Sequence, residues 1–256
     1  METRITRERV GHGPEALPKP DRELVIFSAY ALAYVLIVGL FSVLIRHHPL
    51  PILSAVGSTE DLWYVVFVKL VFLFGVPLAI YRNLGHSISP LFSQQRLNRV
   101  ENISVVLFAF LAGFSLNLGL LPPILQRVSR GATPGAFTLL VAACIPFSAA
   151  FPEELFYRVI FQSLLERHFG RVRGILTTAA LFSLSHLPSR FILAAGVEGR
   201  AGNFASVLEG TLIPVFILGL VFGFLWSRYR NVFLLIALHY GIDFLPNMSS
   251  FFGIRH

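Results

Sequence analysis

The sequence predicts an all-α protein, a polytopic transmembrane helical bundle of seven to eight membrane helices. Of its 256 residues, 55% are hydrophobic and 14% are charged, and the mean hydropathy is +0.69. Soluble domains carry roughly 25% charged residues, so this chain is far more apolar than they are. Residues 24–45 contain no charge at all, and about 20 apolar residues are enough for a helix to cross a bilayer.

The first apolar run, 24–45, is predicted to be a retained membrane helix, because the mixed-charge residues before it show no small-residue cleavage site. Further apolar runs predict six more spans, at about 62–81, 103–125, 136–165, 171–187, 211–227 and 232–246. Glycine, glutamate and arginine interrupt residues 191–207, which leaves an eighth, short or re-entrant segment open. We therefore expect a single membrane domain with three parts: a cytoplasmic tail (1–23), N-terminal helices (24–125) and a C-terminal core (136–246).

The basic residues predict the orientation of the chain. Alternate loops carry 13 lysines and arginines on the side of the N-terminus and 6 on the other side, so the N-terminus is expected to be cytoplasmic. The net charge of +7 is explained by these short loops. We therefore expect an integral, multi-pass membrane protein that contacts the lipid bilayer and binds no nucleic acid.

A few charges lie inside the predicted spans, where each costs about 2.5 to 3.5 kcal/mol on insertion scales. Residues 151–158 read FPEELFYR and contain Glu153, Glu154 and Arg158. Glu154 precedes Arg158 by four residues, the favoured order for an ion pair on one helical face. We interpret the isolated Lys69 as a long side chain that snorkels to the interface or meets a neighbouring carbonyl.

The remaining polar groups can be compared by depth, using the helical rise of about 1.5 Å per residue. On this measure Glu153 and His186 each lie roughly 20 Å from the cytoplasmic ends of their spans, whereas His239 and Asp243 lie roughly 12 and 18 Å deep. Four costly groups from three helices thus fall at similar depth. The sequence therefore predicts one polar cluster inside the bundle.

Three prolines lie next to this cluster. Pro152 lacks an amide hydrogen and is predicted to kink its helix just before the glutamates. Pro188 and Pro246 are predicted to end their helices at the preceding residues, which would leave both helices short for a bilayer. Because broken backbone at membrane depth is tolerated only in protein or beside water, we expect the cluster to face a wet cavity.

The cluster has the groups that amide hydrolysis needs. Glu153 has no cation on its own helix and is a candidate general base. His186 and His239 can share a proton with that base, donate to an oxyanion or bind a metal. Asp243 follows His239 by four residues and can orient its ring. Taken singly, a histidine in an apolar helix is more often a packing residue, so the prediction depends on the common depth of the four groups.

Three stretches resemble the motifs of one family. They are EELFYR from Glu153 to Arg158, FSLSH from Phe182 to His186 and HYGID from His239 to Asp243, which match EExxxR, FxxxH and Hxxx(N/D). In this order and spacing they resemble the CAAX-protease and bacteriocin-processing (CPBP or Abi) intramembrane proteases. The resemblance covers roughly residues 136–246, and the N-terminal helices are similar to the family only in being spans.

The resemblance implies a CAAX prenyl protease type II-like endopeptidase, of the glutamate type, in the plasma (inner) membrane of a prokaryote. It implies that Glu153 and His186 activate water and that His239 and Asp243 support the oxyanion. It also implies that Glu154, Arg158 and Phe182 support the site. The implied substrate is a membrane-associated or lipidated protein or peptide.

Two departures from the family pattern bear on the mechanism. Val159 stands where many members have glycine, and Asp243 stands where the prenyl-protein proteases have asparagine. An ionised aspartate cannot donate to an oxyanion, so Asp243 must be protonated, orient His239 or bind a metal. Nothing resembles HExxH. We favour a metal-independent reaction without a cofactor, and zinc held by Glu153, His186, His239 and Asp243 stays open as the alternative.

Two other classes of function compete with a protease. A non-hydrolytic membrane scaffold or immunity-type protein would use the same polar cluster to bind a partner, and would tolerate the change Glu153→Gln. A cation or proton transporter would also bury acids and histidines. The sequence shows no inverted pair of broken polar helices in its two halves, which disfavours the transporter.

Overall fold

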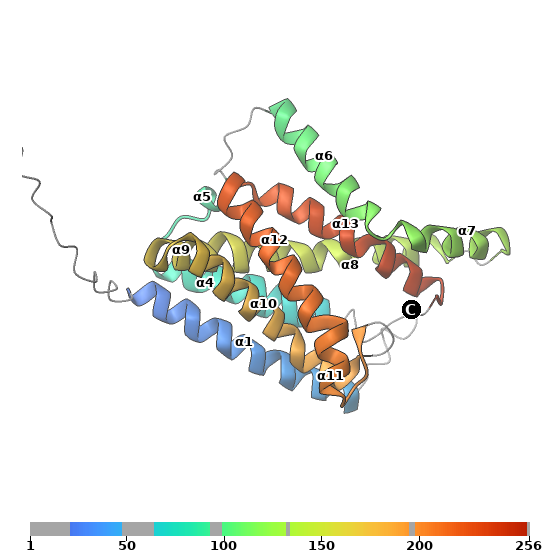
Figure 1. Cartoon of the computed structure of the whole chain (residues 1–256), viewed down its shortest axis with the longest axis horizontal. Coiled ribbons are helices and arrows are strands. Elements are labelled where there is room, and N and C mark those ends of the chain that lie inside the picture. The colour runs from blue at the N-terminus through green and yellow to red at the C-terminus, as the bar shows by residue number, and fades with distance from the viewer. Residues whose placement is uncertain (1–20, 48–63, 93–98, 132–133, 195–197, 255–256) are drawn as a thin grey trace, which may run out of the picture.

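The computed structural model describes residues 21–47, 64–92, 99–131, 134–194 and 198–254. Within these ranges almost every segment is helical, and the described residues contain no strand, only an isolated bridge between Arg200 and Asn203. Figure 1 shows the helices as one bundle, with α6 and α7 projecting from one side. The predicted all-α bundle is therefore confirmed.

The elements follow one another with few breaks, and three segments have π-helical rather than α-helical hydrogen bonding. In chain order the elements are α1 (Arg22–His47), the π-helix η1 (Tyr64–Gly75), α4 (Val76–Asn83), α5 (Ser89–Phe92), α6 (Arg99–Ser115), the 3₁₀ turn η2 (Leu118–Leu120), α7 (Leu121–Ser129), α8 (Ala136–Glu153), the π-helix η3 (Glu154–Gln162), α9 (Ser163–Phe169), α10 (Arg171–Leu193), α11 (Phe204–Val207), the π-helix η5 (Leu208–Leu212), α12 (Ile213–Tyr229) and α13 (Val232–Phe251).

Four helical stretches are long and apolar enough to cross a membrane, namely Arg22–His47, Ala136–Phe169, Phe204–Tyr229 and Val232–Phe251. A bent pair, Val100–Ser115 with Leu118–Ser129, makes a fifth candidate. These helices support an integral membrane protein. The predicted number of seven to eight spans is not confirmed: the segments expected at 62–81 and 171–187 are helical where described but are not among these candidates.

Helix α1 shows how the sequence separates a packed face from an exposed one. Its buried residues recur every three or four positions: Leu24, Phe27, Ala31, Tyr34, Val38, Ser42 and Ile45. That spacing places them on one stripe, which packs against α10. The opposite face exposes large apolar side chains such as Leu36, which is 76% exposed. An apolar outer face of this kind is suited to lipid.

The span predicted at 103–125 is bent instead of straight. Helix α6 ends at Ser115, and the next helical segment, Leu118–Ser129, lies at 59° to it. The reason lies in the residues that follow, since Pro122 and Pro123 occupy the first turn of α7. Proline is tolerated there but clashes in a helix interior, so a continuous helix through both would be costly.

The prediction that Pro188 and Pro246 end their helices is wrong. Helix α10 continues to Leu193 and α13 to Phe251, each with its proline inside. Pro246 deprives one carbonyl, that of Ile242, of its helical partner, and the Asn117 side chain donates to this carbonyl at 2.8 Å. Prolines persist in membrane helices where neighbouring groups satisfy the freed backbone in this way.

The possible eighth segment at 191–207 is a connection in its described part. Helix α10 ends at Leu193, residues 198–203 are not α-helical, and α11 begins at Phe204. Residues 195–197 lie outside the described ranges. Among the described residues this segment therefore contains no separate membrane helix.

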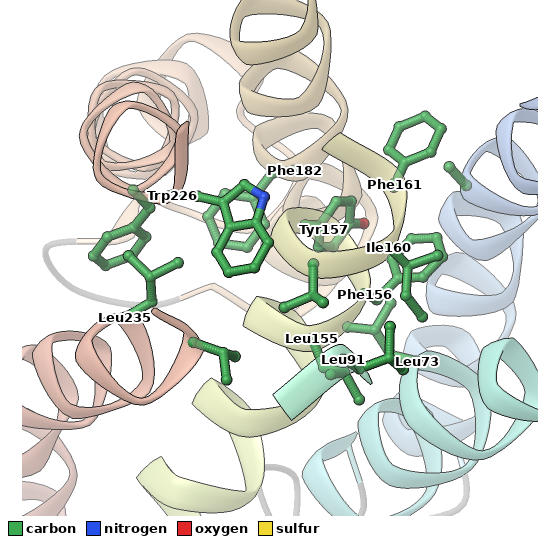
Figure 2. Close-up of a cluster of buried hydrophobic side chains, with 14 of the residues drawn as sticks. Leu73, Leu91, Leu155, Phe156, Tyr157, Ile160, Phe161, Phe182, Trp226 and Leu235 are labelled. Atoms are coloured by element: carbon green, nitrogen blue, oxygen red, sulfur yellow. The ribbon is translucent and has the colours of Figure 1, made fainter. Parts of the chain in front are cut away.

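The centre of the bundle is η3, the continuation of α8. Pro152 cannot donate a backbone hydrogen bond, and the helix changes to π-helical bonding at Glu154, two residues later. All nine residues of η3 are buried. Figure 2 shows apolar side chains around this segment, among them Tyr157, Phe182 and Trp226. Because π-helical turns often occur at functional sites, the change to π-helical bonding at Glu154 agrees with a site at the predicted glutamates.

The site helix α13 is fixed from the other side by α6. Gly113 and Gly241 lie opposite the backbone of the partner helix, so closely that a Cβ on Gly241 would lie 2.3 Å from the Phe110 oxygen. Only a residue without a side chain permits that approach. The reciprocal pair thus sets the position of α13 relative to α6.

Candidate active site

The structure brings the four predicted polar residues together from three helices. Glu153 closes α8, His186 lies on α10, and His239 and Asp243 lie on α13. Glu153 Oε2 is 3.5 Å from His239 Nε2, and Glu153 Oε1 is 4.0 Å from His186 Nε2. The carboxyl group therefore lies between the two imidazole rings, with His186 beside Oε1 and His239 beside Oε2. The common depth counted along the sequence corresponds to a real cluster.

These residues line a partly open cavity of about 170 Å³. Glu153 and His239 are buried, whereas Asp243 keeps 34% of its side chain exposed. The walls also include apolar side chains from α12, such as Leu218 and Phe222. The cavity is large enough for several water molecules, each of which needs roughly 30 Å³. The chemistry predicted for these residues requires such a space.

His186 is held by its own helix. Its Nδ1 lies 2.8 Å from the carbonyl oxygen of Phe182, and because a carbonyl only accepts, Nδ1 carries the proton. Nε2 is the nitrogen that faces Glu153. The gap of 4.0 Å is too long for a direct hydrogen bond but suits one bridging water. The backbone carbonyl one turn earlier thus holds the ring of His186.

His239 is held by Glu154 rather than by Asp243 alone. Nδ1 of His239 donates to Glu154 Oε1 at 2.8 Å, and Nε2 lies 3.4 Å from Asp243 Oδ2. The sequence predicted Asp243 as the group that orients this ring and assigned Glu154 only to Arg158. Glu154 has both contacts, with Arg158 Nε at 3.4 Å from its second oxygen. The predicted ion pair is confirmed, and it extends to a histidine.

Arg158 and Phe182 lie behind the two histidines. The Arg158 guanidinium is fully buried and lies over the Phe182 ring, 4.6 Å from its centroid, as in a cation–π contact. The same ring contacts His186 edge-on at 4.9 Å between centroids. Phe182 therefore connects the charged pair on η3 with the histidine on α10. These contacts agree with a supporting position for both residues.

Lys69 was misjudged from the sequence. Its ammonium lies 2.6 Å from Glu153 Oε1, and only 11% of its side chain is exposed. The residue therefore neither reaches the interface nor relies on a carbonyl alone. Its depth gives the missing signal: Lys69 precedes Arg82 by 13 residues, which places it roughly 20 Å from that end of the helix, the depth counted for Glu153.

The sequence interpretation also missed the outer rim of the cavity. Arg190 lines it and forms an ion pair with Glu198 at 2.5 Å. Thr211, a third lining residue, donates to the Glu198 carbonyl at 2.6 Å. Arg190 follows His186 by four residues, so both lie on one helical face, and this spacing could have revealed it.

The charged groups can also be tested as ligands for a metal. Among the described residues, no three of histidine, cysteine, aspartate and glutamate are arranged to hold a metal ion. The Lys69 ammonium already lies against Glu153 Oε1. A cation beside that oxygen opposes a second one. These donors therefore fit zinc poorly, and independence of metal stays a prediction.

Comparison with known proteins gives a match to a family model. A family model described as "Type II CAAX prenyl endopeptidase Rce1-like" matches residues 135–245. No curated protein and no solved structure matches the chain. The matched segment contains all three motifs and ends just after Asp243. The predicted resemblance to the CAAX proteases is thereby confirmed.

Proposed function

Since residues 135–245 match the model of the type II CAAX prenyl endopeptidases, we propose that this membrane protein is an intramembrane endopeptidase with Glu153 as its general base. The substrate is a membrane-associated or lipidated protein or peptide. One observation supports this proposal above the others: the Glu153 carboxylate lies between His186 and His239 in the partly open cavity. A scaffold needs no base positioned between two rings.

Water activation follows from the positions of Glu153 and His186. A water that bridges the 4.0 Å between Glu153 Oε1 and His186 Nε2 would meet two acceptors, because the proton of His186 is on Nδ1. Glu153 takes a proton from this water while the oxygen attacks the carbonyl carbon of the scissile bond. The proton then passes to the leaving nitrogen, the carbon–nitrogen bond breaks, and the carboxylate is regenerated.

His239 and Asp243 lie where they can serve the oxyanion. Glu154 keeps one proton on Nδ1 of His239. Nε2 faces both Glu153 and Asp243, so a proton on Nε2 has carboxylate acceptors until the substrate arrives. Donation from Nε2 to the tetrahedral oxyanion is the role that we propose for His239. In this proposal Asp243 accepts that proton's hydrogen bond and does not itself donate to the oxyanion.

The test is a comparison of cleavage by the wild-type protein and the Glu153→Gln variant. Both proteins are reconstituted in liposomes with a tagged membrane proteome, and new peptide termini are identified by mass spectrometry. We expect the variant to lose all specific termini, because an amide cannot accept the proton from water. Glu209→Gln is the matched control, since Glu209 is exposed and is not part of the cavity lining.

Two outcomes would contradict the proposal. Equal cleavage by the wild-type protein and Glu153→Gln would exclude Glu153 as the base. A wild-type protein that binds a partner but produces no new termini, with binding intact in the variant, would instead support the scaffold function.

A further inference from the structure

Among the described residues, Lys69 is the one lysine or arginine in direct contact with the carboxylate of Glu153. Its Nζ lies 2.6 Å from Oε1, and the two side chains are 11% and 4% exposed. The chain contains only one other lysine, Lys19, in the N-terminal tail. A buried ammonium and a buried carboxylate are each costly alone, so their pairing determines where both can lie.

The contact fixes how the carboxyl plane of Glu153 is turned. Oε1 faces both Lys69 and His186, whereas Oε2 faces His239. Each carboxylate oxygen has about two lone-pair sites. Lys69 occupies one site on Oε1 and leaves the other for the water beside His186. Rotation of the carboxyl group would break the ion pair, so Lys69 keeps the water-facing lone pair in place.

The helix that carries Lys69 is itself firmly held. It belongs to η1, which packs on α8 and contacts α1. The Tyr30 hydroxyl on α1 donates to the Phe72 carbonyl of η1. The Phe74 and Phe151 rings, from η1 and α8, lie 5.1 Å apart. Lys69 therefore approaches Glu153 from a fixed support.

This support lies outside the segment that matches the family. The match covers residues 135–245, and η1 ends at Gly75. The three motifs that predicted the site all lie within the matched segment. A residue from the N-terminal half thus completes the surroundings of the carboxylate.

We propose that Lys69 is a positioning residue for the peptidase reaction, which acts by holding Glu153 in the orientation that receives the proton from water. The inference rests on the proposed function. It assigns the N-terminal helices a direct part in the site, beyond anchoring the chain. Lys69 does not touch the substrate in this proposal, so its loss lowers kcat and leaves KM nearly unchanged.

The experiment compares three variants of the full-length protein in liposomes, with a cleavable reporter peptide drawn from the termini that the wild-type protein produces. Lys69→Met removes the charge and keeps the length of the side chain. Lys69→Arg keeps a cation. Val71→Met is the matched control, because Val71 lies on the same helix, is 43% exposed and does not line the cavity.

We expect Lys69→Met to lower kcat about 100-fold, the loss typical of a catalytic group displaced by about 1 Å. KM should change less than about threefold, since the ground-state contacts of the substrate remain. Lys69→Arg should recover at least about tenfold of the lost kcat, although its planar fork cannot reproduce the lysine geometry fully. Val71→Met should match the wild-type protein in both constants.

The outcomes separate this inference from the proposed function. If Glu153→Gln is inactive while Lys69→Met retains the wild-type kcat, the inference is wrong and the proposed function stands. If Glu153→Gln is as active as the wild-type protein, the proposed function fails first. A purely structural role would lower the folded fraction of Lys69→Met without changing kcat per folded molecule, which also contradicts the inference. Should Lys69→Met not fold, Lys69→Leu, which is uncharged and cannot donate, takes its place under the same criteria.

Discussion

The contact of Glu154 with both His239 and Arg158 leads to a prediction in which stability and activity separate. Glu154→Gln keeps the shape of the side chain but removes its charge. Arg158 is then left fully buried, with aromatic rings beside it and no opposite charge at 3.4 Å. Removing one partner of a buried pair costs about 3 to 5 kcal/mol of unfolding free energy.

The same change disturbs His239. Glu154 Oε1 accepts the Nδ1 proton at 2.8 Å, and the amide of a glutamine can present an NH₂ group there instead. In a comparable arrangement, the serine protease triad, replacing the buried aspartate by asparagine lowers kcat about 10⁴-fold through the wrong tautomer. We therefore expect Glu154→Gln to lower kcat at least about 100-fold, since His239 is proposed to support the oxyanion rather than to act as the base.

A second variant distinguishes the two effects. Glu154→Gln combined with Arg158→Met removes the unpaired charge, so most of the lost stability should return. The activity should not return, because His239 still lacks the carboxylate, which can only accept and so fixes the proton on Nδ1. Unfolding in detergent micelles gives the stability, and cleavage of a reporter peptide gives kcat. Recovery of both quantities in the double variant, or a single variant that matches the wild-type protein, would refute the reasoning.

Three further predictions concern the helix contacts and the metal. Gly241→Ala should cost about 1 to 3 kcal/mol of unfolding free energy, because its Cβ would lie 2.3 Å from a backbone oxygen of α6. Gly119→Ala is the control and should have little effect, since a Cβ there would have nothing within 4 Å. Equal melting temperatures for the two variants would contradict the close crossing of α6 and α13. Asn117→Ala should lower the unfolding free energy by about 1 to 3 kcal/mol, because it leaves the Ile242 carbonyl unpaired. Adding Pro246→Ala should restore stability, since the new backbone amide can donate to that carbonyl. A double variant no more stable than Asn117→Ala alone would be the contrary result. Chelation with EDTA or phenanthroline should leave cleavage unchanged, and metal analysis of active protein should find less than one zinc per chain. Activity that disappears on chelation and returns with zinc would support the zinc mechanism instead.

The sequence predicted the site better than it predicted the lengths of the helices. Glu153, His186 and His239 could be placed together because the helical rise is nearly constant, so counting residues measures depth. The ends of the helices could not be predicted in this way. Pro246 was expected to end α13, but the Asn117 side chain, more than a hundred residues earlier, satisfies the carbonyl that the proline frees. A contact of that kind cannot be seen in the local sequence.

The contacts of Glu154 were incomplete for a related reason. Spacing along one helix correctly paired it with Arg158, because residues four apart meet. Its bond to His239 joins η3 to α13, and no spacing rule connects two helices whose relative rotation is unknown. Depth alone allowed either Glu153 or Glu154 to face His239. The structure shows that both do, on different ring nitrogens.

Lys69 shows what depth can reveal when it is applied to every intramembrane charge. The lysine was set aside because a single long cation can snorkel, and snorkelling is a sound explanation near a helix end. At roughly 20 Å from the cytoplasmic end of its predicted span, the flexible stem is too short to reach water on that side. A cation at that depth is stabilised by an anion, and Glu153 was a carboxylate at equal depth for which the sequence had found no cation on its own helix. Charge balance between the two halves of the chain therefore favours this pair.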